Sequence, residues 1–194
     1  MDKISFEILK ENANKGDIES LNELAYIYDG GYKDDNGEII IEKDISLAIE
    51  YYTKAIEKGS STASHNLATI YRDIGDYKKA FTLYQKSQEL SSEEWNRPVL
   101  SFSVGLCYLY GIGIEKDTSK AVDIFEAISR KNDDETNYPY EIDEANFILG
   151  QLYLSGIELE EDIEKAREYL LLANKDSDHR SAQELLWLIG QNKQ

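Results

Sequence analysis

The sequence predicts an all-α protein, a right-handed α-α solenoid of helix-turn-helix repeats with a capping helix at each end. A Leu-Ala/Gly-x-x-Tyr phrase or a close variant occurs four times, an alanine-led phrase follows each copy, and successive copies start 43, 37 and 45 residues apart. Periods of this size are typical of helix-pair arrays, which stack into one continuous unit. We therefore expect a single repeat domain over residues 1–194. The first phrase starts at Leu24, Leu67, Val104 and Leu149, and the second at Ala48, Ala80, Ala121 and Ala166.

The first element is a capping helix within residues 1–16. Ile4, Ile8, Leu9 and Ala13 recur at the spacing of one helix face, so they predict a short amphipathic helix. A solenoid needs such an element because a terminal repeat has no neighbour on one side.

The first repeat, residues 17–60, has an enlarged connection between its two helices. Asp17 is expected to cap the first helix, and Asp44 begins the second. The connection contains Asn36 and Gly37 between a polar and a β-branched run. Because Asn-Gly favours tight hairpin turns, we expect a small hairpin there.

Three further repeats follow, over residues 61–91, 92–140 and 141–176. The third opens near Pro98, a residue that the first helical turn tolerates, and the fourth opens near Glu141.

The last predicted element is a C-terminal capping helix within residues 177–194. Its apolar residues again follow the spacing of one helix face. They are Ala182, Leu185, Leu186 and Ile189, with Trp187 beside them.

The repeated phrases resemble the Sel1-like repeats, a family related to the tetratricopeptide repeats. The best match is VGLCYLYGIGIEKDTSKAVDIF, in which Gly111, Gly113, Asp117, Lys120 and Ala121 fall where the family places them. A near match is LGQLYLSGIELEEDIEKAREYL, in which Glu158 replaces the second glycine. The second repeat reads YRDIGDYKKAFTLY and has the short link typical of tetratricopeptide repeats. The resemblance covers nearly all of residues 17–174.

The repeated residues are expected to serve packing. Small residues on the first helix of a pair let the second helix approach closely, and the tyrosines fill the space between pairs. The small residues are Ala25, Ala68, Gly105 and Gly150, and the tyrosines are Tyr28, Tyr71, Tyr108 and Tyr153.

Composition limits the partners and the compartment. The chain carries 38 acidic and 21 basic residues, a formal charge of −17, which repels nucleic acid and anionic membranes. Solubility alone is the alternative explanation of this acidity. The single cysteine, Cys107, cannot form an internal disulfide, and no run approaches the roughly 20 apolar residues that span a bilayer. We expect a cytoplasmic protein.

The resemblance also implies a binding face. In this family the first helices line a concave groove, and their non-packing positions meet the partner. The third of these helices is apolar on all sides, so its apolar residues either form a partner groove or are covered by curvature or by the final helix. Acidic residues of the third connection are expected in an exposed loop. The candidate partner-binding residues are Tyr26, Asp29, His65, Arg72, Phe102, Leu106, Leu109, Tyr110, Phe147, Gln151, Leu154, Asp133, Asp134 and Glu135.

Catalytic, metal and cofactor motifs do not emerge from the sequence. His65 and His179 are far apart, and Cys107 has no neighbouring base. If Gly37 is aligned with the glycine of a calcium-binding loop, Tyr32 and Lys43 stand where acidic ligands are required. We expect no cofactor and no enzymatic activity.

The favoured function is a non-catalytic protein-interaction module that binds a basic partner with an apolar anchor in its concave groove. One specific form is an immunity or antitoxin protein that neutralises a toxin such as a nuclease, because opposite charges speed association. The alternative is a scaffold or regulatory adaptor that joins cellular proteins, and a small-ligand receptor or enzyme is less favoured. The chain is expected to be a monomer alone or a heterodimer with its partner.

Overall fold

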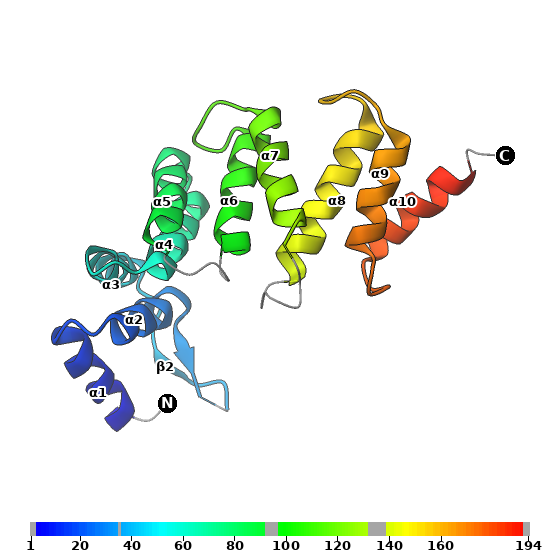
Figure 1. The fold of residues 1–194 in the computed structure, drawn as a ribbon. Helices are drawn as coiled ribbons and strands as arrows, with labels where there is room; N and C mark the ends of the chain where they lie inside the picture. The colour runs from blue at the N-terminus through cyan, green and yellow to red at the C-terminus, as the bar shows by residue number, and fades with distance from the viewer. Residues whose placement is uncertain (1–2, 35, 92–96, 132–138, 192–194) are drawn as a thin grey trace. The chain divides into compact units, whose positions relative to one another are not determined.

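The computed structural model describes residues 3–34, 36–91, 97–131 and 139–191. Within these ranges the chain forms ten helices and one two-stranded hairpin (Figure 1). The helices are α1 (Lys3–Asn14), α2 (Ile18–Gly30), α3 (Ile45–Glu57), α4 (Ser61–Asp73), α5 (Tyr77–Leu90), α6 (Arg97–Tyr110), α7 (Thr118–Ser129), α8 (Pro139–Ser155), α9 (Ile163–Ala173) and α10 (Arg180–Gln191), and the strands are β1 (Tyr32–Lys33) and β2 (Ile39–Ile41).

The helices fall into two compact units, residues 1–92 and 93–194. The first unit holds α1 to α5 with the hairpin, and the second holds α6 to α10. Four packed pairs, α2/α3, α4/α5, α6/α7 and α8/α9, correspond to the repeated phrases. We call the first helix of each pair helix A and the second helix B. The predicted all-α solenoid of helical repeats is confirmed.

Aspartates cap the helices that the sequence marks. The Asp17 carboxylate accepts a hydrogen bond from the Ser20 backbone N–H, and Asp44 accepts one from Leu47. Both predicted caps are therefore confirmed. The remaining B helices begin in the same way, at Asp76, Asp117 and Asp162.

One backbone hydrogen bond closes every A-to-B connection. The N–H of the capping aspartate of helix B donates to the carbonyl oxygen of the phrase tyrosine of helix A, at N···O distances of 2.7 to 3.0 Å. The four bonds join Asp44 to Tyr28, Asp76 to Tyr71, Asp117 to Tyr108, and Asp162 to Tyr153. Connections of different lengths are thus closed by the same bond, between the end of helix A and the start of helix B.

The longest connection contains the predicted hairpin. β1 and β2 pair antiparallel, and the Asp34 carboxylate accepts hydrogen bonds from the backbone N–H groups of Asn36 and Glu38. Gly37 has a φ of 84°, a conformation that glycine adopts without steric cost. The hairpin is therefore a local structure whose signals lie within a few residues.

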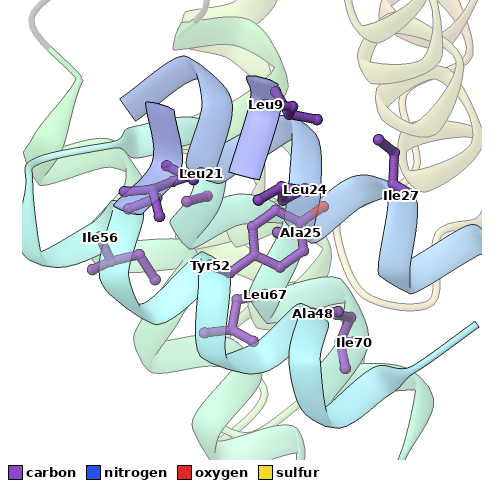
Figure 2. Packing of buried hydrophobic residues seen from close by; sticks show 13 residues of the cluster. Leu9, Leu21, Leu24, Ala25, Ile27, Ala48, Tyr52, Ile56, Leu67 and Ile70 are labelled. Carbon is purple, nitrogen blue, oxygen red and sulfur yellow. The ribbon is translucent and has the colours of Figure 1, made fainter. Parts of the chain in front are cut away.

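Each unit has an apolar core between its helices. In the first unit Leu24, Ala25 and Tyr52 are completely buried, and Figure 2 shows the Tyr52 ring beside the other two side chains. In the second unit Phe125 and Leu149 are completely buried. Large residues of helix B thus occupy the space that small residues of helix A leave free.

The small residues allow the close helix contact predicted from the sequence. A Cβ atom added to Gly150 would lie 2.7 Å from Leu170 Cγ, and one added to Gly105 would lie 2.6 Å from Phe125 Cε1. Such distances are too short for carbon atoms, so only glycine fits at these two positions without a shift of helix B. The role expected of the small residues is confirmed.

Helices form at both ends of the described chain where the sequence predicts them. On α1, Leu9 and Ala13 are buried, but Ile8 is 53% exposed, so its predicted place in the buried stripe is wrong. Within its unit α1 makes its main helix contact with α2. On α10, Ala182 and Ile189 are buried, whereas Trp187 is 63% exposed.

Candidate protein-binding site

The candidate residues of the first unit divide into exposed and buried side chains. Tyr26 on α2 is 70% exposed. Asp29 lies 3.8 Å from the Lys43 ammonium, and the exposed Arg72 guanidinium lies 3.1 Å from the carboxylate of the adjacent Asp73. Tyr26 therefore offers the largest accessible apolar surface of these candidates.

His65 is mainly part of the packing. Its ring lies against Tyr84, with 5.3 Å between ring centroids, and its Nδ1 atom is buried without a hydrogen-bond partner among the described residues. Burial, with a smaller contribution from the Arg72 charge, lowers the pKa of His65 to about 4. The side chain is therefore neutral at physiological pH and contributes little charge to a binding face.

The candidates on α6 also differ in accessibility. Tyr110 is 64% exposed, whereas Leu109 is only 5% exposed and belongs to the core of the second unit. The expectation that Leu109 is accessible to a partner is therefore wrong, since α7 and α8 residues pack around it. Phe102 and Leu106 are half-buried on the same core, and the Phe102 ring lies 5.7 Å from that of Phe125.

On α8, Gln151 is exposed, but Phe147 and Leu154 pack on the cluster that α10 completes. The Phe147 ring centroid lies 4.6 Å from that of His179. The alternative that the final helix covers apolar residues thus holds for this pair. The three acidic candidates of the third connection, Asp133, Asp134 and Glu135, lie outside the described residues.

A second kind of surface lies between two consecutive B helices. The phrase tyrosine of the A helix that separates them in the sequence lies at this place. We call this place a junction. In three repeats the lysine that precedes the motif alanine lies over that tyrosine ring, at 4.1 to 5.2 Å from the centroid. Sequence reasoning assigned these lysines no contact, although the Lys-Ala phrase marks them. The pairs are Lys79 with Tyr71, Lys120 with Tyr108, and Lys165 with Tyr153.

The α7/α9 junction is filled by a polar network. The Glu126 Oε1 atom accepts hydrogen bonds from Lys165 Nζ at 3.3 Å and from the Tyr169 hydroxyl at 3.2 Å, and Lys165 also donates to the Tyr153 hydroxyl at 2.6 Å. The Tyr153 and Tyr169 rings stack with centroids 5.9 Å apart. Burial raises the pKa of Tyr169 to about 12, and the Glu126 charge adds to the shift.

The same network determines the charge of Glu126. Burial opposes its ionisation, but hydrogen bonds and charge from Lys165, with help from Tyr169 and Arg130, outweigh that effect and keep the pKa of Glu126 below its usual value. The Arg130 guanidinium binds the second carboxylate oxygen at 3.1 Å. The carboxylate is therefore a stable acceptor at the centre of the junction.

The α3/α5 junction is instead an open groove of about 470 Å³. Its floor is apolar, and lysine, threonine and glutamate side chains form its rim. The lining residues are Thr53, Ile56, Glu57, Leu67, Tyr71, Lys79, Thr82, Leu83 and Lys86.

An acid-lined cavity of about 280 Å³ lies at the start of α8 and α10 in the second unit. Asp143, Glu144 and Asp178 line it. Burial, followed by the charges of Asp176 and Asp178, raises the pKa of Asp143 to about 6. His179 and Arg180 also line the cavity, and His179 Nε2 lies 3.4 Å from a Glu144 carboxylate oxygen.

The described part of the chain has neither a metal-binding cluster nor a membrane-spanning helix. No group of three or more His, Cys, Asp or Glu residues there could hold a metal ion. No helix in the described ranges has the length and apolar character needed to cross a bilayer. Cys107 is a buried free thiol.

Comparison with known proteins identifies the repeats. The Sel1 repeat model matches residues 18–60, 101–133 and 143–178, and a tetratricopeptide repeat model matches residues 61–94. The ERAD-associated E3 ubiquitin-protein ligase component HRD3 of Candida glabrata is 31% identical over 134 residues, which are 67% of this chain and 15% of that protein. This chain thus corresponds to a small part of that relative.

Solved structures share the fold. A protective antigen with an SLR fold from uropathogenic Escherichia coli superposes with a TM-score of 0.72 and 24% identity, over 96% of this chain and 36% of the other. A Sel1 repeat protein from Oxalobacter formigenes gives 0.68 and 22% identity, over 89% of this chain and 63% of the other. With three matching segments across both units, the chain belongs to the Sel1 repeat family, whose members are protein–protein interaction modules.

Proposed function

We propose that this chain is a non-catalytic module that binds a protein partner through the exposed faces of its A helices. The observation that carries the proposal is the exposure of Tyr26 and Tyr110, 70% and 64%, on the A helices of the two units. Aromatic side chains bury a large area with few rotatable bonds, which is why they are enriched among binding hot spots. These tyrosines are the proposed apolar contacts.

The charge of the chain supports a basic partner. The formal charge is −17, from 38 acidic and 21 basic residues. Opposite charges raise the association rate and oppose wrong partners. A partner with basic surface around an apolar anchor fits both features.

A specific form of this function is an immunity or antitoxin protein in the cytoplasm. A nuclease toxin suits this acidic surface because an enzyme that holds phosphate groups carries basic residues at its active site. An acidic module could cover that surface and block access to nucleic acid.

A scaffold or adaptor is the second candidate. The exposed tyrosines lie in different units, so each unit could hold its own protein. In that case substitutions in one unit would release one partner and leave the other bound.

The test is capture of partners from the native cell on the immobilised chain, followed by identification and binding kinetics. We expect Tyr26→Ser and Tyr110→Ser to increase the dissociation rate, whereas Tyr77→Ser, an exposed tyrosine on a B helix, should not. If both substitutions release the same basic protein, the result supports the immunity or antitoxin function. If each substitution releases a different protein, the result supports the adaptor. Binding indifferent to both tyrosines would exclude the A-helix faces.

Salt dependence tests the charge argument separately. Association with a basic partner should slow as ionic strength rises, because salt screens exposed charges beyond about 8 Å at physiological strength. An association rate that does not change with salt would remove the electrostatic reason for a basic partner.

A further inference from the structure

The open α3/α5 groove has an internal counterpart in the filled α7/α9 junction. Lys79 and Lys165 each precede the motif alanine of their B helix, and Tyr71 of α4 and Tyr153 of α8 each end the Leu-Ala/Gly-x-x-Tyr phrase of their A helix. Both lysines lie over the tyrosine ring, at 4.4 and 4.1 Å from the centroid. The two junctions therefore share their tyrosine and their cation.

They differ at the two positions that fill the second junction. Thr53 stands where α7 has Glu126, and Leu83 stands where α9 has Tyr169. The first unit thus lacks the carboxylate and the aromatic ring that close the junction in the second unit. The groove occurs where these two groups are missing.

The missing carboxylate leaves the Lys79 charge weakly compensated. Among the described residues, the carboxylate nearest Lys79 Nζ is that of Asp76, at 4.0 Å, and the lysine side chain is 58% exposed. Lys165 Nζ, in contrast, donates to a hydroxyl at 2.6 Å and to the Glu126 carboxylate at 3.3 Å. An anion at the Lys79 ammonium would restore the arrangement that the second unit already has.

The charge around the groove favours an anionic group. Lys79 and Lys86 line it against one acid, Glu57, so its lining is net positive in a chain of charge −17. Its floor is formed by Ile56 and Leu67, which are buried, with Leu83 half-buried beside them. A ligand with both a carboxylate and an apolar ring would match the rim and the floor together.

We propose that the α3/α5 groove binds a partner segment in which an acidic side chain lies close to an aromatic one. The carboxylate pairs with Lys79 and Lys86, and the ring covers Leu83 and Ile56, at the place that Tyr169 occupies in the second unit. The occupant is a protein segment, as the family of interaction modules implies. This surface lies on B helices and is separate from the A-helix faces of the proposed function.

The experiment is selection of random displayed peptides on the whole chain. The bound peptides should be enriched in Glu or Asp within a few residues of Tyr, Phe or Trp. Amide chemical shifts of the labelled protein should change around Thr53, Tyr71 and Leu83 when a selected peptide is added. Peptides without an acid, no selected peptides at all, or shifts elsewhere would overturn the proposal.

Two sets of variants make the test specific. The Thr53→Glu/Leu83→Tyr double variant supplies the groups found in the second unit, and it should lose most peptide binding while keeping an unchanged or higher melting temperature. Lys86→Gln should weaken binding about three-fold, as expected for one partly exposed ion pair, whereas Lys78→Gln, outside the groove lining, should have no effect.

Substitution of the rim acid should change peptide binding in the opposite direction. Glu57→Gln should strengthen binding because it removes the one negative charge of the lining. Equal binding by the double variant and the native chain would overturn the proposal. Loss of peptide binding in Tyr26→Ser, with the double variant still binding, would instead assign the peptides to the A-helix face.

Discussion

The α7/α9 and α3/α5 junctions are built on the same framework but present different surfaces. Each has a small A-helix residue, a phrase tyrosine, a capping aspartate bonded to that tyrosine's carbonyl, and a lysine over its ring. One junction is then filled by Glu126 and Tyr169, and the other remains a groove. The comparison shows that the framework residues fix how helices pack, whereas two other positions decide whether the surface is closed.

The largest expected effect concerns the framework itself. Gly150→Leu should lower the free energy of unfolding by about 1–3 kcal/mol, because its side chain would overlap Leu170 and force α9 away from α8. Chemical denaturation measures the change. Gly190→Leu is the matched control, a helical glycine with no atom near its Cβ position, and it should have little effect or stabilise α10 slightly.

The two substitutions together test the repeat register. If Gly150→Leu is tolerated as well as Gly190→Leu, the close contact of α8 and α9 is not a framework feature. The two junctions could then not be compared as variants of one helix packing.

The capping aspartates should have a smaller effect that is similar in both junctions. Asp162→Ala and Asp76→Ala each remove a side-chain acceptor for a helical N–H, at a cost of about 1 kcal/mol. Thermal or chemical unfolding checks this, with Asp123→Ala, an exposed residue within α7, as control. If only one of the two cap substitutions lowers stability, the two junction frameworks are not equivalent.

The filled junction should show a pH dependence that the open one lacks. The folded-state pKa of Glu126 lies below its ordinary value of 4.5, so its contribution to stability is present above that value and is lost as pH falls through the folded-state pKa. Glu126→Gln should therefore remove part of the acid destabilisation of the protein. Unfolding measured against pH tests this, and Glu168→Gln, an exposed change on α9, should leave the profile unaltered.

Local signals explain why much of the fold could be predicted from the sequence. The capping aspartates and the Asn36-Gly37 turn act within a few residues, and the repeated small residues mark close helix contacts directly. These features specify the helices, the hairpin and the packing within each pair. They contain no information about which polar groups meet across repeats.

The candidate site was less predictable because its contacts join distant residues. Glu126 meets Lys165 and Tyr169, 39 and 43 residues along the chain, and no local motif announces the network. Leu109 was mistaken for an accessible residue since α6 is apolar on every side and periodicity could not separate its buried and exposed faces. In the sequence, Thr53 and Leu83 indicate the groove only by comparison with Glu126 and Tyr169, the equivalent residues of the second unit.

The most direct test opens the filled junction and asks whether it gains a binding site. Glu126→Thr with Tyr169→Leu places threonine and leucine at the positions equivalent to Thr53 and Leu83, and Lys165 loses the carboxylate that it now contacts. The measurement is binding of the selected acidic–aromatic peptides, followed by amide shifts, with the first groove closed by Thr53→Glu/Leu83→Tyr. We expect peptide binding to return and amide shifts to appear around Tyr153 and Lys165. A folded variant that binds no peptide at these residues would contradict the claim that the two positions decide between a closed and an open junction.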